Sequence, residues 1–193
     1  MPDLYIIAGC NGAGKTTASF TILPEMLDCK EFVNADEIAR GLSPFKPESV
    51  SFQAGRIMLE RINQLINDKV SFAFETTLST LSYLKTIELA RQKGYTIKLL
   101  YIWLSDINLA IERVSIRVQD GGHNIPADVI ARRYQRGLNN LIEKFIGVSD
   151  YWLIADNSTK PLKFVAEGFA TSAPKIYNAA VWQKINDKSN EKR

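Results

Sequence analysis

The sequence predicts an α/β fold, a single domain over residues 1–193 with a mainly parallel sheet. Apolar segments rich in β-forming residues recur along the chain and alternate with segments of helical periodicity. Such alternation builds a parallel sheet that helices cover on both faces. A length of 193 residues with 46% hydrophobic content suits one domain with a full core and is too short for two ordinary domains.

Five apolar segments are the predicted strands. In chain order they are residues 4–8, 32–35, 70–74, 97–104 and 151–155, and residues 162–165 offer a further short strand. Each of the five is separated from the next by a segment with helical periodicity, as the parallel arrangement requires.

Helices are predicted between these strands. They follow residue 14 and cover residues 36–42, 47–68, 81–94, 107–120, 126–145 and 175–185. In the long helix over 47–68 the apolar side chains share one stripe, so Met58 is expected in the core. Pro126 suits the first turn of a new helix after the glycine-containing break at 120–122. The charged tail, residues 187–193, is expected to fray.

The first predicted strand leads into a phosphate-binding loop. Gly9, Gly14, Lys15 and Thr16 have the spacing G-x-x-x-x-G-K-[ST]. Glycines let the backbone wrap closely, so that N–H groups point at an anion together with the positive end of the following helix. Lys15 is expected to reach the outer phosphates, and the Thr16 hydroxyl to ligate Mg²⁺. The predicted nucleotide contacts are Gly9, Asn11, Gly12, Ala13, Gly14, Lys15, Thr16 and Thr17. The loop thus predicts binding of a nucleoside triphosphate, ATP, with Mg²⁺.

Asp36 follows the second predicted strand. In an open parallel sheet the ligand lies beyond the carboxyl ends of the strands. A carboxylate at this position suits a catalytic base that accepts the proton of an incoming hydroxyl in phosphoryl transfer. Asp36 also begins a helical segment, so capping of that helix is the structural alternative.

Glu75 closes the third predicted strand, where an unpaired buried carboxylate would cost several kcal/mol. We therefore expect it to contact metal-bound water or a substrate hydroxyl. Thr76 and Thr77 either hydrogen-bond the acceptor or shape the turn. Asp106, after the fourth strand, is a rival acid for magnesium, but it also resembles a helix start and ranks below Glu75.

Residues 113–136 are predicted to form a lid. This segment contains five arginines in a helix-break-helix pattern. The guanidinium geometry suits phosphate oxygens, and an arginine on the transferring group accelerates phosphoryl transfer. A solvated helix face is the alternative. We expect phosphate contact from at least one of Arg117, Arg132, Arg133 and Arg136.

His123, the only histidine, lies in the predicted hinge of this lid. A lone histidine is more often a loop residue than a catalyst, and ligand contact is the alternative. Asn157 and Ser158, after the fifth strand, either line an adenine pocket or make a turn, and the turn is favoured.

Bulk properties limit the classes of partner. The net charge of +3 is spread over 24 basic and 21 acidic residues, without the dense basic run of a nucleic-acid footprint. No stretch approaches the roughly 18 to 20 apolar residues of a membrane span. Cys10 lies inside the phosphate loop, where a disulfide would obstruct the ligand, so a reducing compartment is expected. These features predict a cytoplasmic protein that binds neither nucleic acid nor membrane.

Taken in order, the phosphate loop, FVNADEIARG, FETTLS, GGHNIP, RRYQRGLNNL and ADNS resemble the zeta-toxin family of P-loop kinases over residues 3–160. The resemblance implies a sheet of order 2-3-1-4-5 with ATP and Mg²⁺ as cosubstrate. It also implies that Lys15 is the phosphate lysine, Asp36 the hydroxyl-activating base and Glu75 the acceptor-side acid. Family members phosphorylate UDP-N-acetylglucosamine and are inhibited by a small helical antitoxin.

The chain departs from the longer members of that family. It lacks their sizeable C-terminal extension, and His123 stands where they have a lid arginine. It looks closer to the short, compact branch, whose acceptor the resemblance does not define. Arg117 matches a lid arginine of the family, and Arg132 or Arg133 is expected to replace the missing one.

The leading hypothesis is a small-molecule kinase that transfers the γ-phosphate of ATP to a hydroxyl, with a nucleotide sugar as the first acceptor to test. A nucleotide switch is a different class, but the Asn-Lys-x-Asp string of GTPases and the Ser-Gly-Gly-Gln string of transporter ATPases are absent. The third hypothesis is a nucleotide-binding protein that acts mainly through a complex with an antitoxin-like inhibitor.

Overall fold

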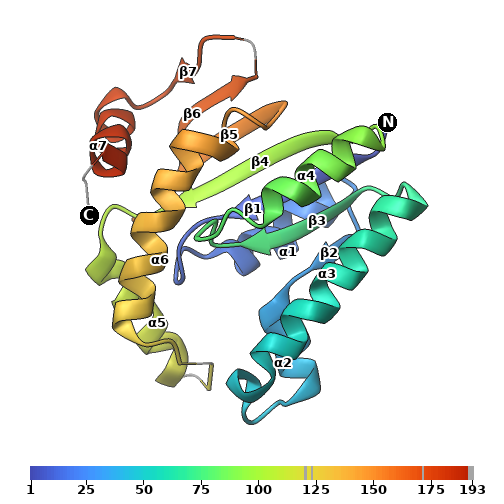
Figure 1. The fold of residues 1–193 in the computed structure, drawn as a ribbon. Coiled ribbons are helices and arrows are strands. Elements are labelled where there is room, and N and C mark those ends of the chain that lie inside the picture. Colours follow the sequence, from blue (N-terminus) through green and yellow to red (C-terminus); the bar gives the residue numbers. More distant parts are fainter. Residues whose placement is uncertain (120, 123, 171, 191–193) are drawn as a thin grey trace.

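The predicted sheet lies at the centre of the molecule (Figure 1). The computed structural model describes residues 1–119, 121–122, 124–170 and 172–190. Within these ranges the strands form one seven-stranded sheet in the order β2-β3-β1-β4-β5-β6-β7. The strands are β1 (Asp3–Ala8), β2 (Glu31–Val33), β3 (Phe72–Thr76), β4 (Thr96–Trp103), β5 (Tyr151–Asp156), β6 (Lys163–Phe169) and β7 (Lys175–Ile176).

The first five strands pair in parallel, and β6 and β7 pair antiparallel at one edge. The predicted order 2-3-1-4-5 is confirmed for these five strands. The predicted total of five strands in the sheet is wrong, because β6 and β7 continue the sheet beyond β5. The further strand offered over residues 162–165 is found as β6, which runs on to Phe169. In β1 every residue from Leu4 to Ala8 is buried, as expected of a central parallel strand.

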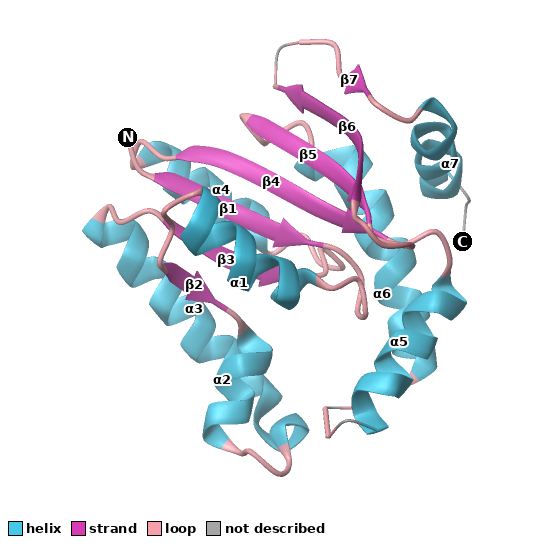
Figure 2. Cartoon of the chain, turned by 180° about the vertical axis from the view of Figure 1, so that it is seen from behind, coloured by secondary structure: helices cyan, strands magenta, loops and turns pink. Residues whose placement is uncertain are grey.

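Helices cover both faces of the sheet unequally (Figure 2). The α-helices of the described ranges are α1 (Lys15–Met26), α2 (Ala35–Leu42), α3 (Ser51–Asp68), α4 (Tyr83–Gln92), α5 (Ile107–Gln119), α6 (Ala127–Asn140) and α7 (Ala179–Asn190). A 3-10 turn, η1 (Pro47–Val50), precedes α3, and a π-helical turn, η2 (Leu141–Phe145), extends α6.

Two apolar cores follow from this arrangement. The larger packs side chains of α3, α4 and α6 against one face of the sheet, and it includes Met58, which is 1% exposed as expected of a core residue. The smaller lies under α1 on the other face, where Leu23 packs with Tyr5 and Ile7 of β1. The carboxyl ends of the parallel strands emerge between these layers, and the polar residues of the site stand there.

The C-terminal segment differs from its prediction. Residues 175–176 form strand β7 and not a helix, and α7 begins at Ala179. The expectation of a frayed tail from residue 187 is wrong for residues 187–190, which continue α7. The helix is fixed because Trp182 stacks on Trp152 of β5, with ring centroids 5.8 Å apart, and Lys188 Nζ donates to the Ser105 carbonyl at 2.9 Å. Residues 191–193 lie outside the described ranges.

The longest helix is α3, with 18 residues that include several charged side chains. Among the helices of the described ranges, none has both the length and the apolar character needed to cross a membrane.

Candidate active site

The phosphate loop connects the end of β1 to the start of α1, as predicted. Gly9 has φ +146°, and a Cβ built there would lie 2.3 Å from the Ile102 carbonyl oxygen, so only glycine fits. Gly14 is the N-cap of α1 in the left-handed conformation, with φ 86°. The loop therefore places the N-terminus of α1 directly after its tight turn, and both features favour an anion.

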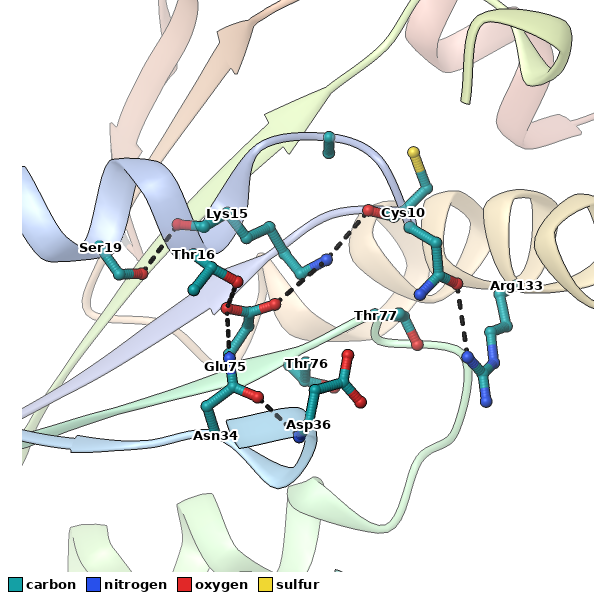
Figure 3. Close-up of polar contacts among 12 residues, drawn as sticks. Cys10, Lys15, Thr16, Ser19, Asn34, Asp36, Glu75, Thr76, Thr77 and Arg133 are labelled. Atoms are coloured by element: carbon teal, nitrogen blue, oxygen red, sulfur yellow. Dashed lines mark hydrogen bonds and ion pairs between the residues drawn. The ribbon is translucent and has the colours of Figure 1, made fainter. Parts of the chain in front are cut away.

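Glu75, at the end of β3, connects three elements (Figure 3). Its Oε1 lies 3.5 Å from Lys15 Nζ, and its Oε2 accepts hydrogen bonds of 2.8 Å from Thr16 Oγ1 and from Asn34 Nδ2. Lys15 Nζ also donates to the Cys10 carbonyl at 2.9 Å. The Glu75 side chain is 11% exposed, and these partners offset the cost of burying its charge.

Asp36 stands in the first turn of α2, and the structure overturns its alternative role as the helix cap. The N-cap is Asn34, whose Oδ1 accepts hydrogen bonds from the backbone N–H groups of Asp36 at 2.8 Å and Glu37 at 3.4 Å. The Asp36 side chain is exposed, and no ion pair of its carboxylate is found in the described part of the chain. Its carboxylate is therefore available to a ligand.

Asn34 was missed by the sequence reasoning. An asparagine that directly precedes an amphipathic helix is a capping signal. Its amide does two things at once, because Oδ1 caps α2 while Nδ2 binds Glu75. Asn34 thereby fixes the start of α2, the helix that carries Asp36. The same side chain holds that start next to the Glu75 carboxylate, which pairs with Lys15.

Two clefts meet at these residues. The larger, of about 660 Å³, extends from the phosphate loop toward α2, η1 and α5. The smaller, of about 240 Å³, lies between the turn after β3, α4 and α6. Four residues line both clefts, namely Asn11, Lys15, Asp36 and Glu75. The predicted acceptor residues Thr76 and Thr77 line the smaller cleft only, and Thr17 of the predicted nucleotide contacts lines the larger.

The arginines of residues 113–136 have different positions. Arg117 on α5 lines the larger cleft. Arg133 on α6 lines the smaller cleft, and its Nη1 donates to Asn11 Oδ1 at 3.4 Å. Arg132 and Arg136 are exposed and line neither cleft. The sequence prediction for His123 falls outside the described residues.

Asn157 and Ser158 form the turn that the sequence favours, and they line neither of the two clefts. Asn157 has a further contact that the sequence did not indicate, because its Nδ2 donates to the Ala13 carbonyl of the phosphate loop at 2.8 Å. Asp106 is exposed, lines neither cleft and accepts a hydrogen bond from the Asn108 backbone at 2.6 Å, as a residue that starts a helix does.

Burial raises the pKa of the Cys10 thiol to about 11. The side chain is 2% exposed, so Cys10 is a neutral packing residue of the loop and not a nucleophile.

The oxygen atoms at this site fit magnesium but do not form a complete cage. Within the described ranges there is no group of three or more His, Cys, Asp or Glu side chains that could hold a metal ion. Mg²⁺ usually takes one or two protein oxygens and completes its shell with phosphate oxygens and water. The adjacent oxygens of Thr16 and Glu75 provide a donor set of that kind.

The five parallel strands have this order, the phosphate loop connects β1 to α1, and one acid follows β2 while another lies at the end of β3. Together these features define a nucleotide-binding protein of the P-loop kinase type. The family model described as Zeta toxin matches residues 1–158, so the chain belongs to the zeta toxin family.

Individual relatives share about a third of their residues with this chain or fewer. An uncharacterized protein of Haemophilus influenzae is 31% identical over 128 residues, which are 65% of this chain and 88% of that protein. The AvrRxo1-ORF1:AvrRxo1-ORF2 structure with ATP superposes with a TM-score of 0.76 at 18% identity over 96% of this chain. This chain spans 63% of the length of that protein. The PezAT toxin-antitoxin structure of Streptococcus pneumoniae has a TM-score of 0.65 at 16% identity, over 100% of this chain and 88% of that protein.

Proposed function

We propose that the chain is a kinase that transfers the γ-phosphate of ATP to a hydroxyl of a small-molecule acceptor. The observation that carries the proposal is the position of Asp36. Asp36 is exposed and lines both clefts, the larger together with residues of the phosphate loop and the smaller together with the hydroxyl-bearing turn after β3. A base between a phosphate donor site and an acceptor site is what phosphoryl transfer to an alcohol requires.

The larger cleft is the proposed nucleotide site. Backbone N–H groups of the loop and Lys15 bind the phosphates, and Arg117 stabilises the transferring group. Lys15 must exchange its Glu75 partner, in whole or in part, for phosphate oxygens. Membership of the family and the likeness to the AvrRxo1 complex with ATP support ATP as the nucleotide.

Magnesium, held by Thr16 and by Glu75 directly or through water, would supply charge neutralisation of the phosphates. The remaining steps belong to side chains. Asp36 accepts the proton of the acceptor's hydroxyl group while the hydroxyl oxygen forms a bond to the γ-phosphorus of ATP. The bond from the γ-phosphorus to the bridging oxygen breaks, and its electron pair stays on ADP. The products are a phosphate monoester, ADP and one proton, which Asp36 then releases to water.

A nucleotide sugar such as UDP-N-acetylglucosamine is the first acceptor to test, because the family resemblance implies it. A complex with an inhibitor is the second candidate. The AvrRxo1 structure pairs ORF1 with ORF2, and PezAT is a toxin-antitoxin system, so both support an antitoxin-like partner for this chain. The two candidates are compatible, since an inhibitor regulates an enzyme.

The test is ADP release by the purified chain with Mg²⁺-ATP against a panel of nucleotide sugars, nucleosides and small alcohols, with Lys15→Ala as the blank. Acceptor-dependent ADP release that the blank lacks supports the kinase and names its substrate class. Tight ATP binding with no turnover on any acceptor contradicts the kinase and favours a protein that acts through its complexes.

A further inference from the structure

The smaller cleft has a composition of its own, apart from the residues that it shares with the larger one. Its floor is the turn after β3, with the hydroxyl groups of Thr76, Thr77, Ser79 and Thr80. Tyr83 of α4 and Arg133 of α6 also line the cleft. Hydroxyl groups, an aromatic ring and one guanidinium suit a polar, hydroxylated ligand better than an apolar one.

Hydrogen bonds hold the turn after β3 in place. Thr77 Oγ1 and Ser79 Oγ lie 2.9 Å apart, and Thr76 Oγ1 accepts a hydrogen bond of 3.1 Å from the Leu78 backbone. The Leu78 carbonyl accepts from Asn140 Nδ2 at 2.6 Å. The turn is therefore already in one arrangement before any ligand enters, which lowers the entropy cost of binding.

Close packing of α6 against the turn after β3 positions Arg133 relative to that turn. Gly137 lies one turn further along the helix, and a Cβ there would be 2.3 Å from the Thr77 carbonyl oxygen. The helix backbone thus rests on the turn, and Arg133, four residues earlier, extends from the same side. Figure 3 shows Arg133 reaching the site from α6, and Asp36 from α2, with Thr77 on the turn between the phosphate loop and α6.

The charges of the smaller cleft leave one cation without an acidic partner. Lys15 and Glu75 pair with each other. Asp36 is the proposed base. The Arg133 guanidinium is half-buried, its one hydrogen bond is to the neutral amide of Asn11 at 3.4 Å, and no carboxylate pairs with it in the described ranges. A guanidinium so placed is suited to an anionic group of the ligand, which it can bind through two parallel hydrogen bonds.

The size of the cleft limits the ligand. About 240 Å³ is below the ~300 Å³ at which the usual range of ligand pockets begins. The volume therefore favours a compact ligand, such as a monosaccharide with one phosphate or a comparable hydroxy acid.

We infer that the smaller cleft binds the acceptor as a compact hydroxylated anion, a sugar phosphate or hydroxy acid, whose anionic group lies on Arg133 and whose reacting hydroxyl lies at Asp36. The inference rests on the proposed kinase function and defines its acceptor. A nucleotide sugar would enter with its sugar and adjoining phosphate, and its nucleoside would lie outside the cleft.

The experiment uses matched neutral and anionic molecules: N-acetylglucosamine with its 1-phosphate and UDP derivative, glucose with glucose 6-phosphate and gluconate, and glycerol with glycerol 3-phosphate and glycerate. Binding to the chain loaded with a non-hydrolysable ATP analogue is measured by ligand-observed NMR, and turnover by ADP release. We expect anionic members to bind and neutral partners not to, and a 1-phosphate to react about as well as its UDP derivative.

Arg133→Gln is the test variant, and Arg132→Gln, its exposed neighbour on α6, is the matched control. Loss of hydrogen bonds to a charged group raises the KM for the acceptor roughly 10- to 100-fold in Arg133→Gln. The KM for ATP stays unchanged, and Arg132→Gln behaves as the native chain.

Equal binding of neutral and anionic partners, or binding by no anionic member, overturns the inference. So does a rise in the KM for ATP alone, which would assign Arg133 to the nucleotide. Anionic members that bind through Arg133 without any ADP release contradict the kinase function while the binding inference stands. ADP release that requires a complete nucleotide sugar supports the kinase and overturns the inference.

Discussion

Lys15 Nζ lies 3.5 Å from Glu75 Oε1, so an acid at the end of β3 holds the lysine of the phosphate loop. The same carboxylate accepts a hydrogen bond from Thr16 Oγ1. Lys15, which is expected to bind the phosphates, and Thr16, which is expected to bind magnesium, are therefore both held by Glu75. Glu75 must change these contacts when the nucleotide enters.

Glu75→Gln keeps a hydrogen-bond acceptor for Thr16 and Asn34 and removes the charge. We expect ATP without magnesium to bind more tightly, by ~1 kcal/mol or roughly fivefold, because Lys15 no longer has a competing anion. Turnover with magnesium should fall at least about 100-fold, since the acid is lost. Calorimetry with ATP in EDTA checks the first part. Glu88→Gln, at an exposed acid of α4 that lines neither cleft, is the control for charge alone, and weaker ATP binding by Glu75→Gln would contradict the argument.

Asp36→Asn preserves the shape of the side chain and removes the proposed base. We expect turnover to fall by roughly 10²- to 10⁴-fold with the dissociation constant of ATP nearly unchanged. Lys15→Ala should instead weaken ATP binding. Stopped-flow turnover and equilibrium binding separate the two effects, and an Asp36→Asn variant with nearly native turnover would show that another group takes the proton.

Asn157→Asp tests the contact between the turn after β5 and the phosphate loop. The change keeps the size of the side chain but removes the donor to the Ala13 carbonyl and adds a charge near the phosphates. We expect the KM for ATP to rise about tenfold or more and the KM for the acceptor to stay unchanged. Asn157→Ala, which adds no charge, should show a smaller rise of the same kind. Asn108→Asp, on the exposed surface of α5, is the control.

Gly137→Ala should destabilise the fold, because its Cβ would meet the Thr77 carbonyl oxygen at 2.3 Å. Overpacking of this kind costs about 1–3 kcal/mol. Gly55→Ala is the matched control, since Gly55 is also inside a helix and a Cβ there would meet nothing within 4 Å. That control should be more stable than the native chain by about 0.5–1 kcal/mol. Thermal and urea denaturation check both, and equal stability of the two variants would contradict the close packing of α6 on the turn.

The buried thiol of Cys10 predicts a loss of stability at high pH. Burial raises its pKa from 9.0 to about 11 in the folded chain, so the unfolded state releases a proton first. The stabilisation is complete below pH 9 and is lost as the pH rises through 11. Urea unfolding of the native chain should therefore weaken between pH 9 and 11 more than that of Cys10→Ala, by roughly 1–2 kcal/mol. Parallel pH dependences would show that the thiol is accessible to water.

The parts of the site that the sequence predicts are those encoded locally. The phosphate loop is a contiguous motif, and the ends of β2 and β3 could be located from apolar runs, which pointed to Asp36 and Glu75. Asn34 and Asn157 were not identified in their roles, because each acts through a partner far along the chain, Glu75 and Ala13 respectively.

The choice between Arg132 and Arg133 likewise could not be made from the sequence. Adjacent residues on a helix point about 100° apart, so the choice depends on the rotation of α6 about its own axis. That rotation is fixed by the contact of Gly137 with Thr77, which only the assembled fold contains. Strand β7 was missed for a related reason, since a two-residue antiparallel edge strand is defined by its partner more than by its own residues. The strand offered over residues 162–165 was found as β6, which extends further, to Phe169.

The contacts that complete the phosphate loop span most of the chain. Thr16 reaches Glu75 across 59 positions, Asn11 reaches Arg133 across 122 and Ala13 reaches Asn157 across 144. Synthesis proceeds at about 5–20 residues per second from the N-terminus, so the loop leaves the ribosome well before its supports exist. A nascent chain that ends before β5 carries the motif without the contact of Asn157 with the loop, so we expect ATP binding to develop only after β5 has been made.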